Sequence, residues 1–251
     1  MQEITSRKNP QVQHLKKLGT DRAYREVSGE FLCDGLKLYE EAVSAGAAIS
    51  LSATDRREVT DMLACPTILV PEDVLHSISP LKNPQTVLFA CQMPDTTPIA
   101  NPSRVLVLDG VQDPGNVGTL IRAASAFCVD QVILVGDCAD PYNPKTVRAA
   151  MGATFRQSVC AMAVDELVQY AAQNNLTLLG AALAEDGRDI REPLPAAPLA
   201  VAIGSEGQGL SAELLVHCHG TVRIPMEAAA ESLNAAVAGS ILLWEMYRRE
   251  V

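Results

Sequence analysis

The second half of the chain contains apolar runs typical of strands, separated by stretches whose apolar residues have helical spacing. RVLVLD at 104–109 and QVILV at 131–135 are continuous apolar runs, and TLIRAASAFC between them has helical spacing. Runs that are apolar at every position are typical of parallel strands covered on both faces by helices. The pattern therefore predicts an α/β domain with a parallel sheet.

The same criteria predict the remaining elements of this domain. They are helices at 145–151 and 165–174, strands at 154–160, 176–179 and 199–203, and a last helix in ESLNAAVAGSILLWEMYRRE. One side of that helix is apolar and carries Leu233, Val237, Ile241 and Trp244. Glu231 at its start and Arg248 and Arg249 at its end suit the helix dipole.

Shorter apolar stretches fill the first part of the chain. LKLYEEAVSAG has helical spacing, PTILV and TVLFA read as strands, and the Pro/Thr-rich tract MPDTTPIANPS follows them. Such a tract is typical of a linker. We therefore expect a smaller α/β domain at 1–95, a linker at 96–103 and the second domain at 104–251.

Composition narrows the class of protein. The hydrophobic fraction is 48% and the charged fraction 20%, as in ordinary globular chains. No stretch approaches the ~18 apolar residues of a membrane span, and the first residues show no targeting pattern, so we expect a cytoplasmic protein without a membrane partner.

The seven cysteines include no C-x-x-C pair, which argues against a disulfide framework or a zinc ribbon. Interpreted as strand residues, His217 and His219 cannot converge with Cys218 on one ion, so no metal is expected.

The net charge of −10 is unevenly spread along the chain. Residues 1–25 contain six basic and two acidic side chains. Proteins bind phosphate backbones mainly through Lys and Arg, so this basic arm is a candidate for RNA binding in an otherwise acidic chain. The candidates for RNA binding in this arm are Arg7, Lys8, Lys16 and Lys17. The alternative interpretation is a solvated helix face.

A first glycine-rich segment, DGVQDPGNVGTLIRAA, joins a predicted strand to a predicted helix. Such loops bind anions well, and Asn116 is a candidate N-cap. The glycine spacing differs from the dinucleotide pattern G-x-G-x-x-G, which argues against a dehydrogenase. Arg122 follows Gly118 by about one turn and should overhang the loop, or else simply face solvent.

Two further segments carry candidate chemistry. LAVAIGSEGQGLSAELL is a strand that ends at Gly204 and continues into a glycine-rich loop, where open α/β sheets bind ligands. Ser205 lacks the G-x-S-x-G elbow, which argues against a hydrolase. In RIPMEAAAESLNAAVAGSILL, Pro225 ends a strand, and Ser232 and Asn234 are expected in the first turn of the last helix. Ser232 alone could be an N-cap.

Taken together and in order, these segments resemble the SpoU (TrmH) family of RNA ribose 2′-O-methyltransferases, in the SPOUT superfamily. The matching stretches are DPGNVGTLIRAASAF, IGSEGQGLS and IPMEAAAESLNAAVAGSILLWE, with DPYNPKTVRAAMGA similar to the family's R-A-x-x-G-A element. ITSRKNPQVQHLKKL and GEFLCDGLKLYEEA resemble the substrate-binding domain that often precedes it, whose fold is similar to ribosomal protein L30e. Cys128 stands where the family often has glycine, and Asp34 replaces a common glutamate.

The resemblance implies a C-terminal trefoil knot, S-adenosylmethionine as methyl donor, no metal, an RNA substrate and a homodimer with active sites near the subunit interface. The residues implied for the S-adenosylmethionine pocket are Ile203, Gly204, Gly209, Ile224, Met226 and Leu233. Those implied for catalysis are Arg122, Glu206, Asn116, Ser232 and Asn234.

The sulfonium is already a good methyl donor, so the protein must chiefly align the reacting atoms and manage the hydroxyl proton. Because arginine stays protonated, we expect Arg122 to anchor a phosphate and stabilise the developing alkoxide rather than act as a base. Glu206 would orient Arg122 or accept the proton, and the amide and serine side chains would hold the ribose or the loop. The basic arm and the extra domain favour ribosomal over transfer RNA. The alternatives are a non-catalytic RNA-binding or assembly module and methylation of a base nitrogen.

Overall fold

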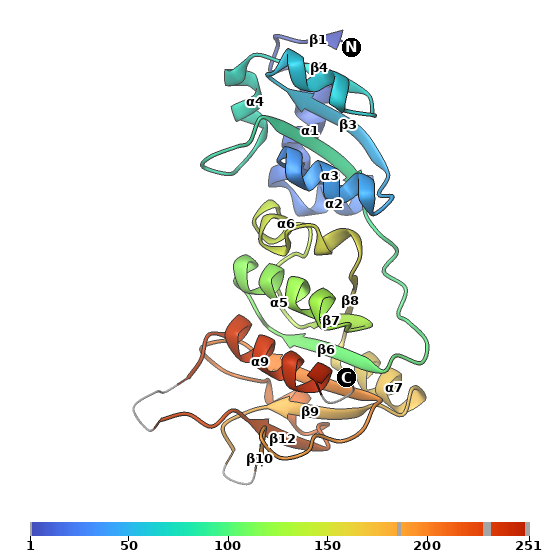
Figure 1. Ribbon diagram of the computed structural model, residues 1–251, viewed down its shortest axis with the longest axis vertical. Coiled ribbons are helices and arrows are strands. Elements are labelled where there is room, and N and C mark those ends of the chain that lie inside the picture. Colours follow the sequence, from blue (N-terminus) through green and yellow to red (C-terminus); the bar gives the residue numbers. More distant parts are fainter. Residues whose placement is uncertain (1, 185–186, 228–231, 249–251) are drawn as a thin grey trace. The chain divides into compact units, whose positions relative to one another are not determined.

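In the computed structural model, which describes residues 2–184, 187–227 and 232–248, the chain forms two compact units (Figure 1). The first unit comprises Met1–Pro94 and Asp140–Arg156, and the second comprises Asp95–Ala139 and Gln157–Val251. The return of residues 140–156 to the first unit is not a feature that the sequence pattern predicts. The domain boundaries at 95 and 104 remain predictions from the sequence.

A five-stranded mixed sheet forms the centre of the first unit. Its order is β1 (Gln2–Glu3), β4 (Thr67–Leu69), β3 (Ile49–Thr54), β5 (Val87–Gln92) and β2 (Glu30–Asp34). The first three strands run parallel, and β5 pairs antiparallel with both of its neighbours. The predicted strands PTILV and TVLFA thus correspond to β4 and β5.

Helices cover both faces of this sheet. One core contains apolar residues of α1 (Pro10–Thr20) and α4 (Glu72–Ile78), and the other those of α3 (Leu36–Ser44) and α6 (Pro144–Ala150). The short helix α2 (Arg22–Ser28) follows α1, and the 3-10 turns η1 (Arg57–Met62) and η2 (Ala153–Phe155) complete the unit. The predicted helix at 145–151 is therefore confirmed as α6.

Segment 140–156 is built into the first unit by three kinds of contact. Tyr142 packs against Phe31, with ring centroids 5.0 Å apart. Arg25 pairs with Asp140, and both side chains are almost completely buried. Gly152 has φ +87°, and a Cβ there would lie 2.9 Å from the Cβ of Glu41, so this position requires glycine. The glycine of the R-A-x-x-G-A element therefore serves close packing.

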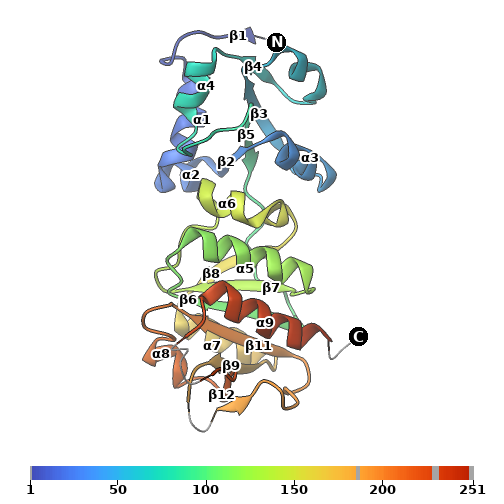
Figure 2. The ribbon, with the colours of Figure 1, turned by 60° about the vertical axis from the view of Figure 1, so that its left-hand side comes forward.

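The second unit contains a seven-stranded sheet (Figure 2). Its order is β10 (Arg188–Asp189), β12 (Gly220–Arg223), β9 (Thr177–Ala181), β11 (Leu199–Gly204), β6 (Arg104–Asp109), β7 (Gln131–Val135) and β8 (Ser158–Met162). Every pair in this sheet is parallel. The predicted α/β class with a parallel sheet is confirmed, and β6 and β7 coincide with the predicted runs.

Helices of the second unit cover both faces of its sheet. Residues of α7 (Val164–Gln173) and α8 (Ala212–Leu215) share one core with β6, β7 and β11. On the other face α5 (Pro114–Ala126) packs against α9 (Ala235–Arg248), which also contacts β11. The apolar runs of β6, β7 and β11 thus match strands buried on both sides.

Two predictions about local structure were wrong. The strand expected at 154–160 begins only at Ser158, because residues 153–155 form the turn η2 after Gly152. His217 and His219 lie in the turn between α8 and β12 rather than within a strand, and the Nδ1 atom of His219 accepts a hydrogen bond from the backbone of Leu178 at 3.1 Å. Within the described ranges, no three metal-ligating side chains gather.

No helix among the described residues is long and apolar enough to cross a membrane. The expected helix-dipole partners Glu231 and Arg249 lie outside the described residues, whereas Arg248 occupies the last turn of α9.

Candidate active site

The two glycine-rich loops follow neighbouring strands. β6 and β11 pair in parallel register, with Asp109 opposite Gly204 at their carboxyl ends. The loops that leave these two residues therefore begin side by side at the edge where open α/β sheets bind ligands. The third segment reaches the same edge through the start of α9.

The first loop places Asn116 inside α5. The helix begins at Pro114, and its N-cap is Asp113, whose side chain accepts a hydrogen bond from the Asn116 backbone at 2.9 Å. The prediction that Asn116 is the N-cap was therefore wrong, because Asp113 followed by proline is the better start. The amide side chain of Asn116 is consequently free for other bonds, and the residue is only 8% exposed.

The second loop is a tight reversal between Ser205 and Gly209. Their backbones exchange two hydrogen bonds of 3.0 and 2.9 Å, and Gly209 has φ +70°. A Cβ on Gly204 would lie 2.0 Å from the carbonyl carbon of Gly209, so any side chain at that position would displace the loop. Glu206 lies on this reversal.

The third segment is fixed by Asn234, which caps α9. Its Oδ1 atom accepts hydrogen bonds from the backbones of Ala236 and Val237 at 3.0 and 3.2 Å. The expectation that Ser232 and Asn234 lie in the first helical turn was wrong, since α9 starts at Ala235 and Ser232 precedes it. Ser232 is exposed.

The three segments are joined by one hydrogen-bond network. The Nδ2 atom of Asn116 donates to Oε1 of Glu206 at 2.9 Å. The Nδ2 atom of Asn234 donates to the same carboxylate oxygen and to Oδ1 of Asn116, the latter at 3.0 Å. Among the described residues nothing donates to Oε2 of Glu206. The network thus fixes the carboxylate and leaves one oxygen for a ligand.

Arg122 does not take part in this network. It lies on the exposed side of α5 and forms no hydrogen bond or ion pair with the described part of the chain. The expected orientation of Arg122 by Glu206 is not seen within one chain. Its guanidinium is accessible to a ligand from solution.

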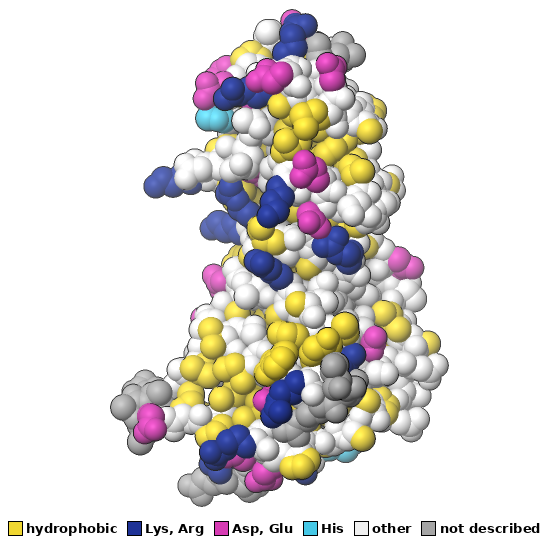
Figure 3. Space-filling model, in the orientation of Figure 1, with side chains coloured by type: hydrophobic (Ala, Val, Ile, Leu, Met, Phe, Trp, Pro, Cys, Tyr) yellow, Lys and Arg dark blue, Asp and Glu magenta, His cyan; other side chains and the backbone are white. Residues whose placement is uncertain are grey.

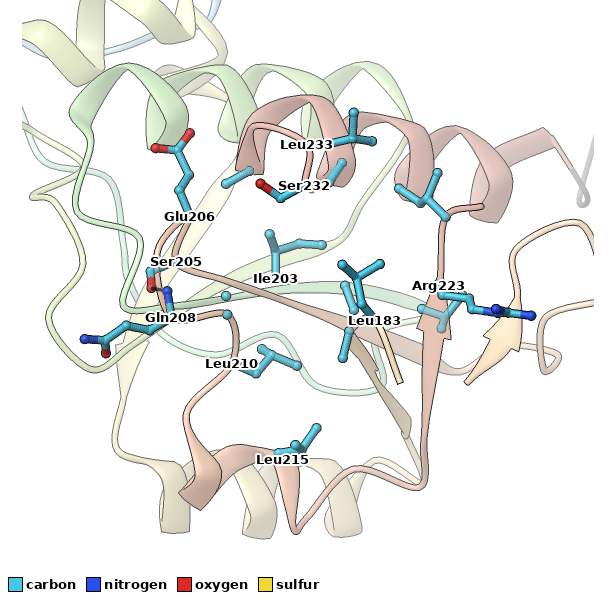
Figure 4. Close-up of a pocket in the computed structure, with 18 of the residues that line it drawn as sticks. Leu183, Ile203, Ser205, Glu206, Gln208, Leu210, Leu215, Arg223, Ser232 and Leu233 are labelled. Atoms are coloured by element: carbon cyan, nitrogen blue, oxygen red, sulfur yellow. Dashed lines mark hydrogen bonds between the residues drawn. The ribbon is translucent and has the colours of Figure 1, made fainter. Parts of the chain in front are cut away.

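An apolar cavity of about 420 Å³ opens between the second and third segments (Figure 4). All six residues predicted for the cofactor pocket line it: Ile203, Gly204, Gly209, Ile224, Met226 and Leu233. In Figure 4, Leu210 and Leu215 lie on the opposite side of the cavity from Leu233, and the Glu206 carboxylate points away from these leucines. The volume falls within the range of small-molecule sites.

A second, more polar cavity lies on the other side of the Ser205–Gly209 reversal. It is lined by Asp109, Gln112 and Asp137 together with Asn116 and Glu206. Glu206 lines both cavities, since it also borders the apolar one. Glu206 therefore lies where the two cavities adjoin, on the reversal that separates them.

Comparison with known proteins places this site in a family. Residues 103–244 match the SpoU rRNA Methylase family, and residues 9–89 match the MRM3-like substrate binding domain. The 23S rRNA (guanosine(2553)-2'-O)-methyltransferase RlmP of Bacillus subtilis is 33% identical over 249 residues, which are 98% of this chain and 99% of the relative. The chain belongs to the SpoU rRNA methylase family. The family predicted from the three segments is thus confirmed.

Solved structures of similar proteins agree with the fold. The AdoMet-bound rRNA methyltransferase from Sinorhizobium meliloti has a TM-score of 0.88 at 30% identity, covering 100% of this chain and 98% of that one. The SpoU methyltransferase AviRb from Streptomyces viridochromogenes, in complex with AdoMet, has a TM-score of 0.86 at 27% identity, covering 97% and 98%. Both similarities extend over the two units of the SpoU family member described here.

Several lining residues of the apolar cavity were missed from the sequence. They are Ala181 at the end of β9 with Ala182 and Leu183 after it, Leu210 before α8 and Leu215 at its end, and Val222 in β12. The strand at 176–179 was predicted. Had its position beside β11 been known, its carboxyl end would have been expected to line the ligand pocket, because ligands of open α/β sheets bind at that edge. The strand order that places it there depends on long-range contacts, which a local pattern does not contain.

The predicted RNA-binding residues all lie on the surface of the first unit. Arg7 pairs with Asp73 at 2.6 Å, and the Lys17 ammonium lies 5.1 Å from the centre of the Tyr24 ring. Lys8 and Lys16 are exposed and form no ion pair with any described residue. Arg7 is therefore already neutralised by a neighbour, whereas the lysines can take a new partner.

Proposed function

We propose that this chain transfers the methyl group of S-adenosylmethionine to a ribose 2′-hydroxyl of ribosomal RNA. The observation that carries the proposal is the position of Glu206, which borders both an apolar and a polar cavity and is held by amides from the other two segments. Methyl transfer needs a donor pocket and an acceptor pocket that meet at one point. The reaction class and the methyl donor predicted from the sequence agree with the relatives, whose names state rRNA 2'-O-methylation and bound AdoMet.

The apolar cavity fits S-adenosylmethionine. Leucine and isoleucine side chains would flank the adenine, and the close backbone approach at Gly204 would present peptide groups to its edge. When bound, the sulfonium supplies an activated methyl group that needs no further chemical assistance from the protein. The charge of the second unit, which carries all of the net −10, also favours a cationic ligand.

The chain's own residues would manage the acceptor hydroxyl. A ribose hydroxyl is a weak acid, so its proton must be taken as the oxygen attacks. The free Oε2 atom of Glu206 can accept that proton, directly or through water, while Asn116 and Asn234 hold the carboxylate in place. Arg122, accessible on α5, would bind a phosphate of the RNA and stabilise negative charge on the oxygen. Ser232, exposed at the rim, would hydrogen-bond the ribose.

Finer features of the family are proposed with this function. The packing of α9 on both α5 and β11, which brings the third segment beside the loop after β11, supports a trefoil knot in the second unit. The mixed sheet between helix layers supports an L30e-like first domain. The proposed site of action is the cytoplasm.

A homodimer is also part of the proposal. Val237 and Trp244 are two turns apart on α9 and remain 48% and 47% exposed. Trp244 belongs to an aromatic cluster with Phe127 and Tyr247 at one end of α9. A second copy that covers this face would bury apolar surface near Arg122 on the neighbouring helix α5.

The central assignment is tested with Arg122→Ala. We expect methylation of ribosomal RNA to fall by about 100-fold or more, because one charge-stabilising donor is lost. Binding of S-adenosylmethionine, measured by calorimetry, should be unchanged because Arg122 does not line the apolar cavity. Arg188→Ala, which removes another exposed arginine of the second unit, is the matched control and should keep parent activity. Parent-rate methylation by Arg122→Ala would contradict the assignment.

The atom that receives the methyl group separates the proposal from its closest alternative. Total RNA from cells with and without the gene is digested to nucleosides and analysed by mass spectrometry. We expect the amount of one 2′-O-methylnucleoside to fall without the gene. A lost base-methylated nucleoside would instead indicate nitrogen methylation, and no change in either would indicate a non-catalytic module.

A further inference from the structure

Charge is divided unequally between the two units. The first unit contains thirteen basic and thirteen acidic residues, so the entire net charge of −10 belongs to the second. The second unit has no lysine, and its basic residues are seven arginines. A unit with this charge repels a phosphate backbone overall. Attraction of a long RNA must therefore come from the first unit, and from cations there that are not already neutralised.

One such cation, Lys82, lies on an anchored loop between α4 and β5. Asp34 fixes both ends of this loop, because it accepts hydrogen bonds from the Gln85 backbone at 2.8 Å and from the Ser79 hydroxyl at 3.1 Å. Gly35 next to it has φ +119°, and a Cβ at that position would lie 3.4 Å from the Cγ atom of Gln85. The Asp34-Gly35 pair therefore positions the loop, while Lys82 itself is exposed.

Helix α6 brings two more cations to the same place. Lys145 and Arg148 are three residues apart and so share one face of the helix. The Nη2 atom of Arg148 donates to the carbonyl oxygen of Asn83, the residue after Lys82, at 3.2 Å. Burial raises the pKa of Asp34, and the nearby charge of Arg148 opposes that rise. The loop and α6 thus meet at Arg148.

These three side chains form no ion pair with any residue in the described ranges. Lys82 and Lys145 are exposed, and Arg148 is partly exposed. In Figure 3, Lys and Arg side chains gather over the part of the first unit where Figure 1 shows α6 and the α4–β5 loop. The Asp34-Gly35 pair holds the loop that carries Lys82, and helix α6, in which the R-A-x-x-G-A element begins at Arg148, carries the other two cations.

We propose that Lys82, Lys145 and Arg148 form a binding surface for the phosphate backbone of the substrate RNA. The proposal rests on the proposed function for the identity of the RNA, but it assigns the contact to a surface other than the predicted N-terminal arm. Spaced, unpaired cations on a rigid surface suit consecutive phosphates, since each contact releases condensed counterions. An acidic protein is the competing partner for such a surface.

The test compares two double variants that each remove two positive charges. Lys145→Gln with Arg148→Gln removes the proposed contacts, whereas Arg56→Gln with Arg57→Gln removes exposed arginines that already have acidic partners in Glu58 and Glu3. Affinity for deproteinised 23S rRNA is measured by filter binding over a range of salt concentrations. We expect the first pair to weaken binding about tenfold and to reduce the salt slope by roughly 1.5, and the second pair to stay within twofold of the parent.

Two further measurements exclude a folding effect and separate this proposal from the proposed function. Lys82→Gln alone, which disturbs none of the hydrogen bonds described above, should weaken binding in the same direction, and S-adenosylmethionine affinity should be unchanged in every variant. An equal loss of RNA affinity in both double variants would contradict the proposed binding surface. So would a parent protein that binds no RNA but binds an acidic protein through Lys145 and Arg148. Methylation of the same RNA by the parent protein reports independently on the proposed function.

Discussion

The two units of this chain use charge in opposite ways. In the first unit basic and acidic residues balance, and ion pairs such as Arg25 with Asp140 and Arg156 with Glu41 tie segment 140–156 to the rest. In the second unit the active-site segments are joined by neutral amides around a single carboxylate, Glu206. Ion pairs hold segment 140–156 in the first unit, whereas neutral amides around one carboxylate join the active-site segments in the second.

This difference suits a division of labour. A site that must stabilise a transition state gains from fixed hydrogen-bond donors that need no reorganisation, and amides held by helix starts provide them. A surface that binds RNA needs cations, and the acidic second unit has only seven arginines and no lysine. The net charge of −10 is therefore compatible with an RNA enzyme, because the charge is not on the unit proposed to bind the backbone.

Breaking the buried ion pair gives the largest expected effect on stability. Arg25 donates to Asp140 at 3.1 and 2.5 Å and to the backbone oxygen of Leu18 at 2.7 Å. Arg25→Ala leaves a nearly buried carboxylate without its cation, so we expect a loss of about 3–5 kcal/mol in the free energy of unfolding. Urea denaturation followed by circular dichroism measures it.

Arg7→Ala is the matched control in the same unit, since the pair of Arg7 with Asp73 is more than half exposed on both sides. Its loss should cost about 1 kcal/mol or less. Similar losses for Arg25→Ala and Arg7→Ala would show that segment 140–156 is not held by its buried ion pair, and the comparison between the units would fail.

The sequence predicted those features that depend on neighbouring residues. Strands β6 and β7 were found to the residue, and all six predicted cofactor residues line one cavity, because continuous apolar runs and glycine loops are local signals. The start of α5 was misplaced because two adjacent signals competed, and Asp113 with Pro114 outweighed Asn116. The error did not affect the expectation that the Asn116 amide holds the ribose or the loop, and because this amide is not used as a cap it is available to bind Glu206.

Other features could not be predicted from local pattern. Residues 140–156 follow a strand of the second unit, yet their apolar side chains Tyr142 and Val147 are buried in a core of the first. Only contacts between residues far apart in the chain decide this, such as Asp140 with Arg25. Likewise, the partnership of Asn116 with Asn234 spans more than a hundred residues and has no periodic signature.

The dual role of Asn234 offers a sharper test of the amide network. Asn234→Ala removes both the N-cap of α9 and a donor to Glu206, so we expect a loss of about 1 kcal/mol in stability and a fall in methylation of roughly 100-fold. Asn234→Asp keeps the capping oxygen but places a carboxylate beside Glu206. It should retain parent stability within about 0.5 kcal/mol while losing the same activity, as thermal unfolding and a methyl-transfer assay can show. Full activity of Asn234→Asp would mean that the donor to Glu206 is not needed.

The smallest expected effect is on stability, and it concerns the residue with positive φ that follows one helix in each unit. Gly29 after α2 and Cys128 after α5 both have positive φ, +67° and +53°, a conformation that costs a side-chain-bearing residue about 1 kcal/mol or more. Cys128→Gly should therefore stabilise the protein by about 0.5–1 kcal/mol without changing methylation, since the cysteine is exposed and lines neither cavity. Gly29→Ala is the reciprocal variant: no atom lies within 4 Å of the added Cβ, so only the backbone penalty remains and stability should fall by a similar amount. Calorimetric unfolding of both variants checks the pair, and a destabilised Cys128→Gly would mean that the thiol side chain contributes packing that outweighs the strain of its backbone.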